Sequence, residues 1–252
     1  MVSTHSVARA RTSHSDQATG GCRSLRSHYP AHHAKCRTCP LRADRRRPAG
    51  TLAVVSADST PQPAFRSLAW PLQTERLSLR PAELADAEAL WVHRQLPEVG
   101  KWLGWHPVDH ADWMATYPDK YLDTLVVELD GRIVGDIMLS TGDGWGQREV
   151  RDQAAGVQAE LGWTFSPEVA GRGLATEAVR AVIALCFTDL GLRRVEAGAF
   201  ADNTPSWRLM ERVGMRRESY SVRDSLHRDL GWIDGVLYAL LADEWAALHQ
   251  AP

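Results

Sequence analysis

The order of strand-like and helix-like segments in this 252-residue chain predicts a mixed fold of the α+β or α/β class. Several short runs alternate apolar with polar residues, a pattern typical of half-buried strands. In the second half, two such runs are each followed by a stretch with helical spacing, which favours a sheet covered by helices over a β-sandwich. The expected order is β α α β β β α β α β β.

The first half of the folded region is predicted to hold one strand, two helices and a hairpin. Leu77 and Leu79 alternate with polar neighbours, which predicts a half-buried strand that ends at Pro81. Asp130-Gly131 is a strong two-residue turn signal between apolar alternations. The predicted ranges are a strand over 72–80, helices over 83–95 and 109–117, an irregular aromatic segment over 97–108, and hairpin strands over 124–129 and 132–140.

The second half is organised around a strand, a tight loop and a helix. Glu160–Phe165 mixes apolar, β-branched and aromatic residues and predicts a strand, which Ser166-Pro167 ends. Apolar residues then recur at helical spacing from Leu174 to Leu190, and Gly191 closes that helix. The other predicted ranges are a polar loop over 141–156, strands over 193–200, 215–222 and 232–241, a charged connection over 223–231, and helices over 204–213 and 242–249.

The loop before the central helix has the chemistry of an anion site. Gly171 and Gly173 flank Arg172. The first turn of a helix leaves N–H groups unpaired at the positive end of its dipole, and neighbouring glycines let a ligand approach them. Such a site fits a pyrophosphate, with Arg172 as an added cation. The alternative is a loop that needs glycine only for its backbone angles. Thr176 stands where a dinucleotide fingerprint has its third glycine, so that motif is excluded.

Residues in and after this loop resemble the GNAT acetyltransferase superfamily. Gly173-Leu174-Ala175 fits the second half of the family's coenzyme-A loop, Gln/Arg-x-x-Gly-x-Gly/Ala, whereas Ala170 departs from the usual Gln or Arg. The resemblance is closest to the branch with the ribosomal-protein N-terminal acetyltransferases and covers roughly residues 68–248. Further matching segments are 201–206 and 209–215, similar to the family's next helix and strand, and 235–241 with 243–245, similar to its last strand and tail.

The resemblance implies a mixed, mostly antiparallel central sheet flanked by helices. In that fold the central strand splays from its parallel neighbour near residues 163–166 and 200–203, and the gap receives the pantetheine arm of acetyl-CoA. Succinyl-CoA is an alternative acyl donor, and no metal is implied. The implied cofactor-binding residues are Trp163, Thr164, Phe165, Gly171, Arg172, Gly173, Leu174, Ala175, Thr176 and Asn203.

Acyl transfer from a thioester to an amine needs a group that takes the amine's proton and a donor for the leaving thiolate. Glu160 is the candidate base, because some family members place a catalytic carboxylate at this point of the strand and burial in a cleft would raise its pKa toward neutral. Ser206 is the candidate donor implied by the branch, since Met210 stands where many members have a catalytic Tyr. A hydrogen-bonded structural Glu and a first-turn helix Ser are the alternatives.

The acceptor side is expected in the helix–loop–helix over 83–117. In the family this region lines the acceptor pocket, and Trp102 and Trp105 are the candidate substrate contacts. Trp113 and His106 lie in the same region, where aromatic side chains serve equally well as packing. Asn203 would contact the pantetheine or phosphate arm, and its alternative role is the N-cap of the following helix.

Residues 1–63 are predicted to be a disordered basic tail, and residues 64–252 the acyltransferase domain. The first 64 residues contain nine Arg, one Lys and three Asp but no Glu, so the rest of the chain is acidic although the whole carries a net charge of −2. The alternatives for the tail are a zinc site around Cys36-x-x-Cys39, a transit peptide, and an over-long start assignment. Cys186 is predicted to be a small core residue.

The predicted function is transfer of an acetyl group from acetyl-CoA to a primary amine by direct attack in a ternary complex. The amine belongs to a peptide N-terminus or to a small molecule. A reducing, cytoplasmic setting fits the cysteine usage, and a monomer or homodimer is expected without membrane or nucleic-acid partners. The alternatives are a CoA-binding module without catalysis, and a ribosome- or nucleic-acid-associated protein that acts through the basic tail.

Overall fold

A mixed eight-stranded sheet runs through residues 63–249, which are the residues that the computed structural model describes. The strand order is β1-β2-β3-β4-β5-β6-β8-β7, and every neighbouring pair is antiparallel except β5 and β6, which are parallel. This confirms the expected mixed, mostly antiparallel sheet. The predicted tail and the alternatives for it lie almost entirely outside the described residues, and the proposed boundary after residue 63 stays a prediction.

The elements follow each other in nearly the predicted order. The strands are β1 Leu72–Gln73, β2 Ser78–Pro81, β3 Thr124–Leu129, β4 Arg132–Gly142, β5 Gln158–Phe165, β6 Arg194–Phe200, β7 Arg216–His227 and β8 Gly231–Leu241. The helices are α1 Ala87–Arg94, α2 Pro97–Gly100, α3 His110–Thr116, α4 Leu174–Thr188, α5 Thr204–Arg212 and α6 Ala242–His249. Short 3-10 turns connect several of them, including one over Arg148–Ala154 within the predicted polar loop.

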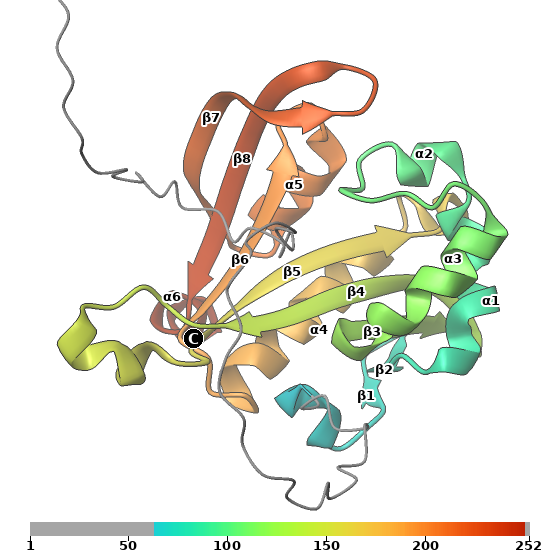
Figure 1. Ribbon diagram of the computed structural model, residues 1–252. Helices are drawn as coiled ribbons and strands as arrows, with labels where there is room; N and C mark the ends of the chain where they lie inside the picture. Colours follow the sequence, from blue (N-terminus) through green and yellow to red (C-terminus); the bar gives the residue numbers. More distant parts are fainter. Residues whose placement is uncertain (1–62, 250–252) are drawn as a thin grey trace, which may run out of the picture. The chain divides into compact units, whose positions relative to one another are not determined.

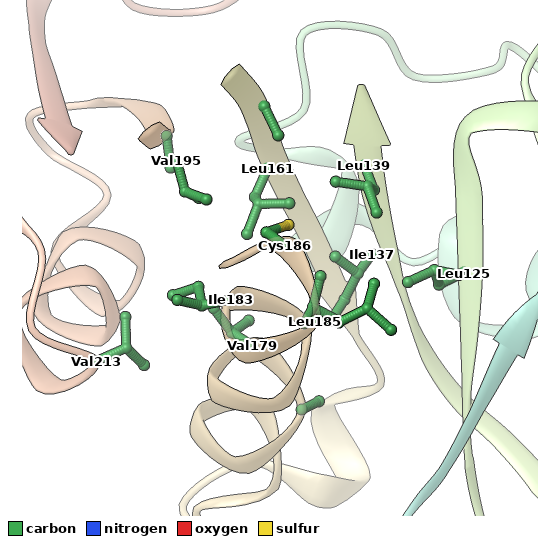
Figure 2. Close-up of a cluster of buried hydrophobic side chains, with 14 of the residues drawn as sticks. Leu125, Ile137, Leu139, Leu161, Val179, Ile183, Leu185, Cys186, Val195 and Val213 are labelled. Carbon is green, nitrogen blue, oxygen red and sulfur yellow. The ribbon is translucent and has the colours of Figure 1, made fainter. Parts of the chain in front are cut away.

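The main core lies between the sheet and α4, which covers one face together with α5 (Figure 1). Val179, Ile183 and Cys186 of α4 point toward Leu161 and Val195 of the central strands (Figure 2). All of these side chains are buried, and burying a large aliphatic side chain stabilises a fold by about 1.5–3 kcal/mol. Cys186 is a core residue as predicted, and burial raises the pKa of its thiol to about 12.

A second, smaller core covers part of the opposite face of the sheet. There α1 and α3 pack against the strands around β3 (Figure 1). Trp113 is 1% exposed, and its indole N–H donates to the carbonyl oxygen of Ala87 at 2.8 Å. Trp113 is therefore a structural residue that joins the two helices.

The predicted strand over 72–80 is wrong in one respect, because it is two short strands joined by a turn. The N–H of Thr74 donates to the carbonyl oxygen of Leu77 at 2.9 Å, and the N–H of Leu77 donates to the Thr74 hydroxyl at 2.9 Å. Leu72 then pairs with Leu79 across the turn. A threonine that bonds its own local backbone competes with a continuous strand.

The predicted charged connection over 223–231 is also wrong, since most of it belongs to a long hairpin. β7 continues to His227, and β8 begins at Gly231. A bulge interrupts β7, because Ser221 pairs with Gly235 while Ser225 pairs with Ile233. Most of β7 is exposed, so its sequence lacks the apolar alternation that signals a strand.

Two smaller differences concern helices. Pro97–Gly100 forms one helical turn inside the segment that was expected to be irregular. The predicted helix over 83–95 begins with a 3-10 turn, Leu84–Asp86, before α1. No helix of residues 63–249 is long and apolar enough to cross a membrane.

Candidate active site

The parallel strands β5 and β6 separate after a short paired stretch. They pair at Gln158↔Arg194, Ala159↔Val195 and Glu160↔Glu196. Residues 161–165 and 197–200 lie beyond this stretch, and we call them the β5–β6 fork. β5 stays paired with β4 and β6 with β8 along the fork, and the two strands diverge in Figure 1. The separation begins earlier than the predicted positions near 163 and 200.

The glycine loop stands at the open end of this fork. Gly171 and Gly173 have φ angles of +74° and +78°, a conformation that favours glycine, and Gly173 is the N-cap of α4. Arg172 between them is exposed. The first turn of the fifteen-residue helix α4 therefore presents its N–H groups at the open end of the fork.

A side-chain network that sequence reasoning missed holds this loop in place. Glu177 in the first turn of α4 accepts hydrogen bonds from the Thr74 hydroxyl at 2.6 Å and from Nε of Arg76 at 2.7 Å. Nη1 of Arg76 also donates to the carbonyl oxygen of Arg172 at 3.0 Å. Burial raises the pKa of Glu177, but the hydrogen bonds from Thr74 and Arg76 outweigh it and hold the pKa below its usual value. The loop is thus tied to the β1–β2 turn.

Glu160, the predicted base, lies at the closed end of the fork. It pairs in register with Ser140 on β4 and with Glu196 on β6. The expectation of a buried carboxylate is wrong, because the Glu160 side chain is exposed. The helices α1 and α3 pack around β2 to β4 and leave this part of the sheet face uncovered (Figure 1).

Ser206, the predicted thiolate donor, lies in the first turn of α5 and is half-buried. This helix begins just after β6 and therefore at the open end of the fork. Met210, one turn further on, is 1% exposed and belongs to the main core. Asn203 is the N-cap residue by position, but its side chain makes no capping hydrogen bond.

The predicted cofactor residues differ in whether a ligand could reach their side chains or only their backbone groups. Trp163 and Phe165 pack against the main core, and Leu174 is fully buried there. These residues can therefore meet a ligand in the fork chiefly through their backbone groups. Thr164 faces the opposite side of β5, where it pairs with Asp136. Ala175 and Thr176, in the first turn of α4, are half-buried.

A buried charged cluster behind Thr164 was also missed from the sequence. Asp136 is 1% exposed, lies 3.2 Å from Nε2 of His93, and forms an ion pair with Arg94. Burial raises the pKa of Asp136, but the positive charge of Arg94 and the His93 hydrogen bond hold the pKa below its usual value. A charged residue inside the apolar run of β4 was the available signal. The cluster attaches α1 to the sheet beside the fork.

The two predicted substrate tryptophans occupy different surroundings. The ring centroid of Trp102 is 6.1 Å from that of Phe200, the last residue of β6. Trp105 instead stacks on Trp113 at 6.1 Å, within the smaller core. Trp102 is therefore next to the open end of the fork, whereas Trp105 supports the helices that flank it.

The sequence of this chain is similar to a family model and to several named relatives. A family model described as an acetyltransferase (GNAT) domain matches residues 76–216, more than half of the chain. The N-acetyltransferase p20 of Bacillus licheniformis is 32% identical over 69% of this chain and 98% of that protein. YdaF of Bacillus subtilis, which carries the provisional name ribosomal N-acetyltransferase, is 29% identical over 68% of this chain and 94% of that protein. YnaD of Bacillus subtilis is 36% identical over 86 residues, and this match covers 34% of this chain and 50% of YnaD.

Solved structures show the same fold. A GNAT acetyltransferase from Bacillus anthracis superposes with a TM-score of 0.59 at 28% identity and covers 69% of this chain and 99% of that one. RimJ of Mycobacterium smegmatis, solved in complex with CoA-disulfide, superposes with a TM-score of 0.52 at 25% identity and covers 69% of this chain and 90% of that one. The glycine loop, the fork and these matches agree, and the chain belongs to the GNAT acetyltransferase family, whose members use acyl-CoA as the acyl donor.

Proposed function

We propose that this protein transfers an acetyl group from acetyl-CoA to a primary amine by direct attack within a ternary complex. The observation that carries the proposal is that the glycine loop before α4 and the open end of the β5–β6 fork coincide. One elongated ligand with a pyrophosphate and an amide-bearing arm would use both features. Acetyl-CoA has this form.

The loop supplies the anion site of this proposal. The N–H groups of the first turn of α4, the helix dipole and the exposed Arg172 favour the pyrophosphate. The arm then follows the fork, where the free edges of 161–165 and 197–200 can pair with its amides as a neighbouring strand would. Asn203 is available to the arm, because its side chain takes no part in capping α5.

The chemistry is one substitution at the thioester carbonyl. The amine nitrogen bonds to the carbonyl carbon, the carbon–sulfur bond breaks, and the amine's proton passes to the Glu160 carboxylate. The leaving thiolate receives a hydrogen bond from the Ser206 hydroxyl, or a proton that Ser206 regains from water. In this proposal Glu160, exposed at the closed end of the fork, takes the amine's proton through intervening water, and ordering of the two substrates supplies much of the rate.

The acceptor in this proposal is a primary amine on a peptide N-terminus or on a small molecule. YdaF, which is matched over 94% of its own length, carries the name of a ribosomal N-acetyltransferase, and that name favours an amine on a protein. The segment around Trp102 is half-buried, so part of its surface remains accessible to either kind of acceptor.

The cofactor site is tested with two glycines at opposite ends of α4. Gly173 and Gly191 have φ angles of +78° and +62°, so alanine imposes similar backbone strain at each. Thermal unfolding of the full chain should shift by several degrees with acetyl-CoA at about a hundredfold excess over Kd, equivalent to ~2.7 kcal/mol. Gly173→Ala should lose this shift, and Gly191→Ala should keep it. Equal shifts in both variants would overturn the placement of the cofactor.

The catalytic assignments are tested by thiol release from acetyl-CoA with a panel of amines. Glu160→Gln and Ser206→Ala should each lower kcat by about 10²-fold or more if they transfer protons. Glu196→Gln is the matched control for Glu160, because the two glutamates pair in register on adjacent strands. Variants as active as the wild type would exclude these residues. A protein that binds acetyl-CoA but releases no thiol with any amine would be a CoA-binding module.

A further inference from the structure

The turn between β7 and β8 reaches across to the segment 97–106, which contains α2, and is held there by three hydrogen bonds. Arg228 donates from Nη1 to the carbonyl oxygen of Gly100 at 2.8 Å and from Nη2 to that of Leu103 at 2.7 Å. His227 lies 2.8 Å from the carbonyl oxygen of Lys101 through its Nε2. Three carbonyl groups within the short stretch 100–103 are thus held by two neighbouring side chains, and we call residues 227–230 the strap.

The imidazole of His227 is fixed on both sides. Its Nδ1 accepts from the N–H groups of Asp229 at 3.1 Å and Leu230 at 3.3 Å. Nδ1 therefore carries no hydrogen, and Nε2 must be the nitrogen that donates to Lys101. With an exposed fraction of 3%, His227 is a rigid connection between the strap and the α2 segment.

The same imidazole connects the strap to the fork. Its ring centroid is 5.2 Å from that of Phe200 and 5.4 Å from that of Trp102, whose own centroids are 6.1 Å apart. Phe200 is the last residue of β6, at the open end of the fork. The three rings therefore couple the position of the α2 segment to the open end of the fork, where the candidate thiolate donor Ser206 also lies.

A hollow of about 450 Å³ lies between the strap and the α2 segment. Pro97, Gly100 and His106 line one side, and His227 and Leu230 line the other. Gly100 is required here, because a Cβ on it would approach the His106 ring to 2.5 Å. Nδ1 of His106 is buried and, within residues 63–249, has no hydrogen-bond partner. The hollow thus has walls from both segments.

We propose that the strap holds the α2 segment in the position that receives the amine, with Arg228 and His227 as positioning residues for the acceptor. The inference rests on the proposed acetyl transfer. Neither side chain needs to touch the reacting atoms, since each acts through the backbone of 100–103. Loosening the strap should weaken acceptor binding while the cofactor site at 171–176, on the other side of the fork, stays intact.

The test compares Arg228→Ala with Arg228→Lys and with Arg223→Ala as the matched control. Arg223 is on the same hairpin and holds its position through its backbone N–H, which donates to Asp234. The acceptors are a tripeptide amide with a free α-amino group and phenethylamine. Arg228→Ala should raise the acceptor KM about tenfold, with kcat and acetyl-CoA affinity within about twofold of the wild type. Arg228→Lys should recover part of this loss, and Arg223→Ala should resemble the wild type.

Hydrogen exchange of the variants without substrate tests the strap independently of catalysis. Arg228→Ala should speed exchange in 97–106 and leave 171–176 unchanged. Unchanged exchange, or an acceptor KM that does not rise, would overturn the inference. A wild-type protein that binds acetyl-CoA but releases no thiol with either amine would count against the proposed function, and the exchange data would still decide whether the strap holds 97–106.

Discussion

The two faces of the sheet are joined to their helices by different interactions. On the α4 face, aliphatic side chains such as Ile183 and Leu161 pack without direction-specific contacts (Figure 2). On the α1 face, the buried Asp136 binds both the buried His93 and the partly exposed Arg94. Apolar packing fixes how much surface is buried, whereas a buried charge with two partners also fixes the orientation of the helix. The orientation of α1 determines where the α2 segment, 97–106, begins.

The largest expected effect comes from breaking the buried cluster. Asp136→Ala removes one partner and leaves the Arg94 charge unpaired beside a buried His93, which typically costs about 3–5 kcal/mol. Urea denaturation should show this loss in the free energy of unfolding. Asp136→Asn is the control, because it keeps the shape and one hydrogen-bond acceptor and should cost less. A loss below about 1 kcal/mol for Asp136→Ala would show that the two faces are equivalent.

Acid should remove the same contribution from the wild-type protein. The pKa of Asp136 is lower in the folded protein than the usual value of about 3.9 in an unfolded chain. Its contribution is therefore fully present above about pH 4 and is lost as the pH falls through the folded pKa. The free energy of unfolding should drop more steeply below pH 4 in the wild type than in Asp136→Asn. Parallel curves of the free energy of unfolding against pH would contradict a lowered pKa of Asp136 in the folded protein.

A conservative change on the α4 face should have a smaller effect. Ile183→Val removes one methylene from the main core and should cost about 0.5–1.5 kcal/mol in the free energy of unfolding. It should leave the acceptor KM unchanged, since the packing on this face imposes no specific direction. Equilibrium denaturation and steady-state kinetics of the same preparation measure both quantities. A raised acceptor KM would mean that the core also positions the acceptor side.

The smallest effect on stability is expected from the partly exposed ion pair between Arg76 and Glu177. The Arg76 and Glu177 side chains are 42% and 15% exposed, so Arg76→Ala should change the free energy of unfolding by less than about 1 kcal/mol. Because Arg76 also holds the backbone of Arg172, acetyl-CoA should bind about fivefold more weakly, on the order of 1 kcal/mol. Calorimetric titration measures that affinity. Full affinity in the variant would leave Arg76 with no role in the loop.

Local signals in the sequence were sufficient for the elements with regular patterns. Asp130-Gly131 forms the turn between β3 and β4 with both residues at positive φ, and the spacing of α4 produced its buried face. The long β7–β8 hairpin was missed because most of β7 is exposed. Without a buried face, a strand has no alternation to reveal it.

The candidate site was predictable only where backbone geometry requires a residue type. Gly171 and Gly173 adopt positive φ angles, which favour glycine. The residue type itself therefore marks the glycine loop in the sequence. The exposure of Glu160 depends on how far α1 extends across the sheet, which strand alternation does not encode. Arg228 and Arg76 act on backbone carbonyl groups of distant segments, and no local pattern marks such contacts.

The bulge in β7 has a consequence for solubility. β7 is the last strand of the sheet, and a long, straight outer strand invites pairing with a second chain and aggregation. The backbone of Arg223 turns to a φ of +51°, and its N–H is directed inward to Asp234. The ladder is therefore interrupted midway along an otherwise exposed strand that carries Val222 and Leu226 on its surface. Asp234, by holding this irregularity, removes part of the regular edge that a second chain would need for sheet pairing.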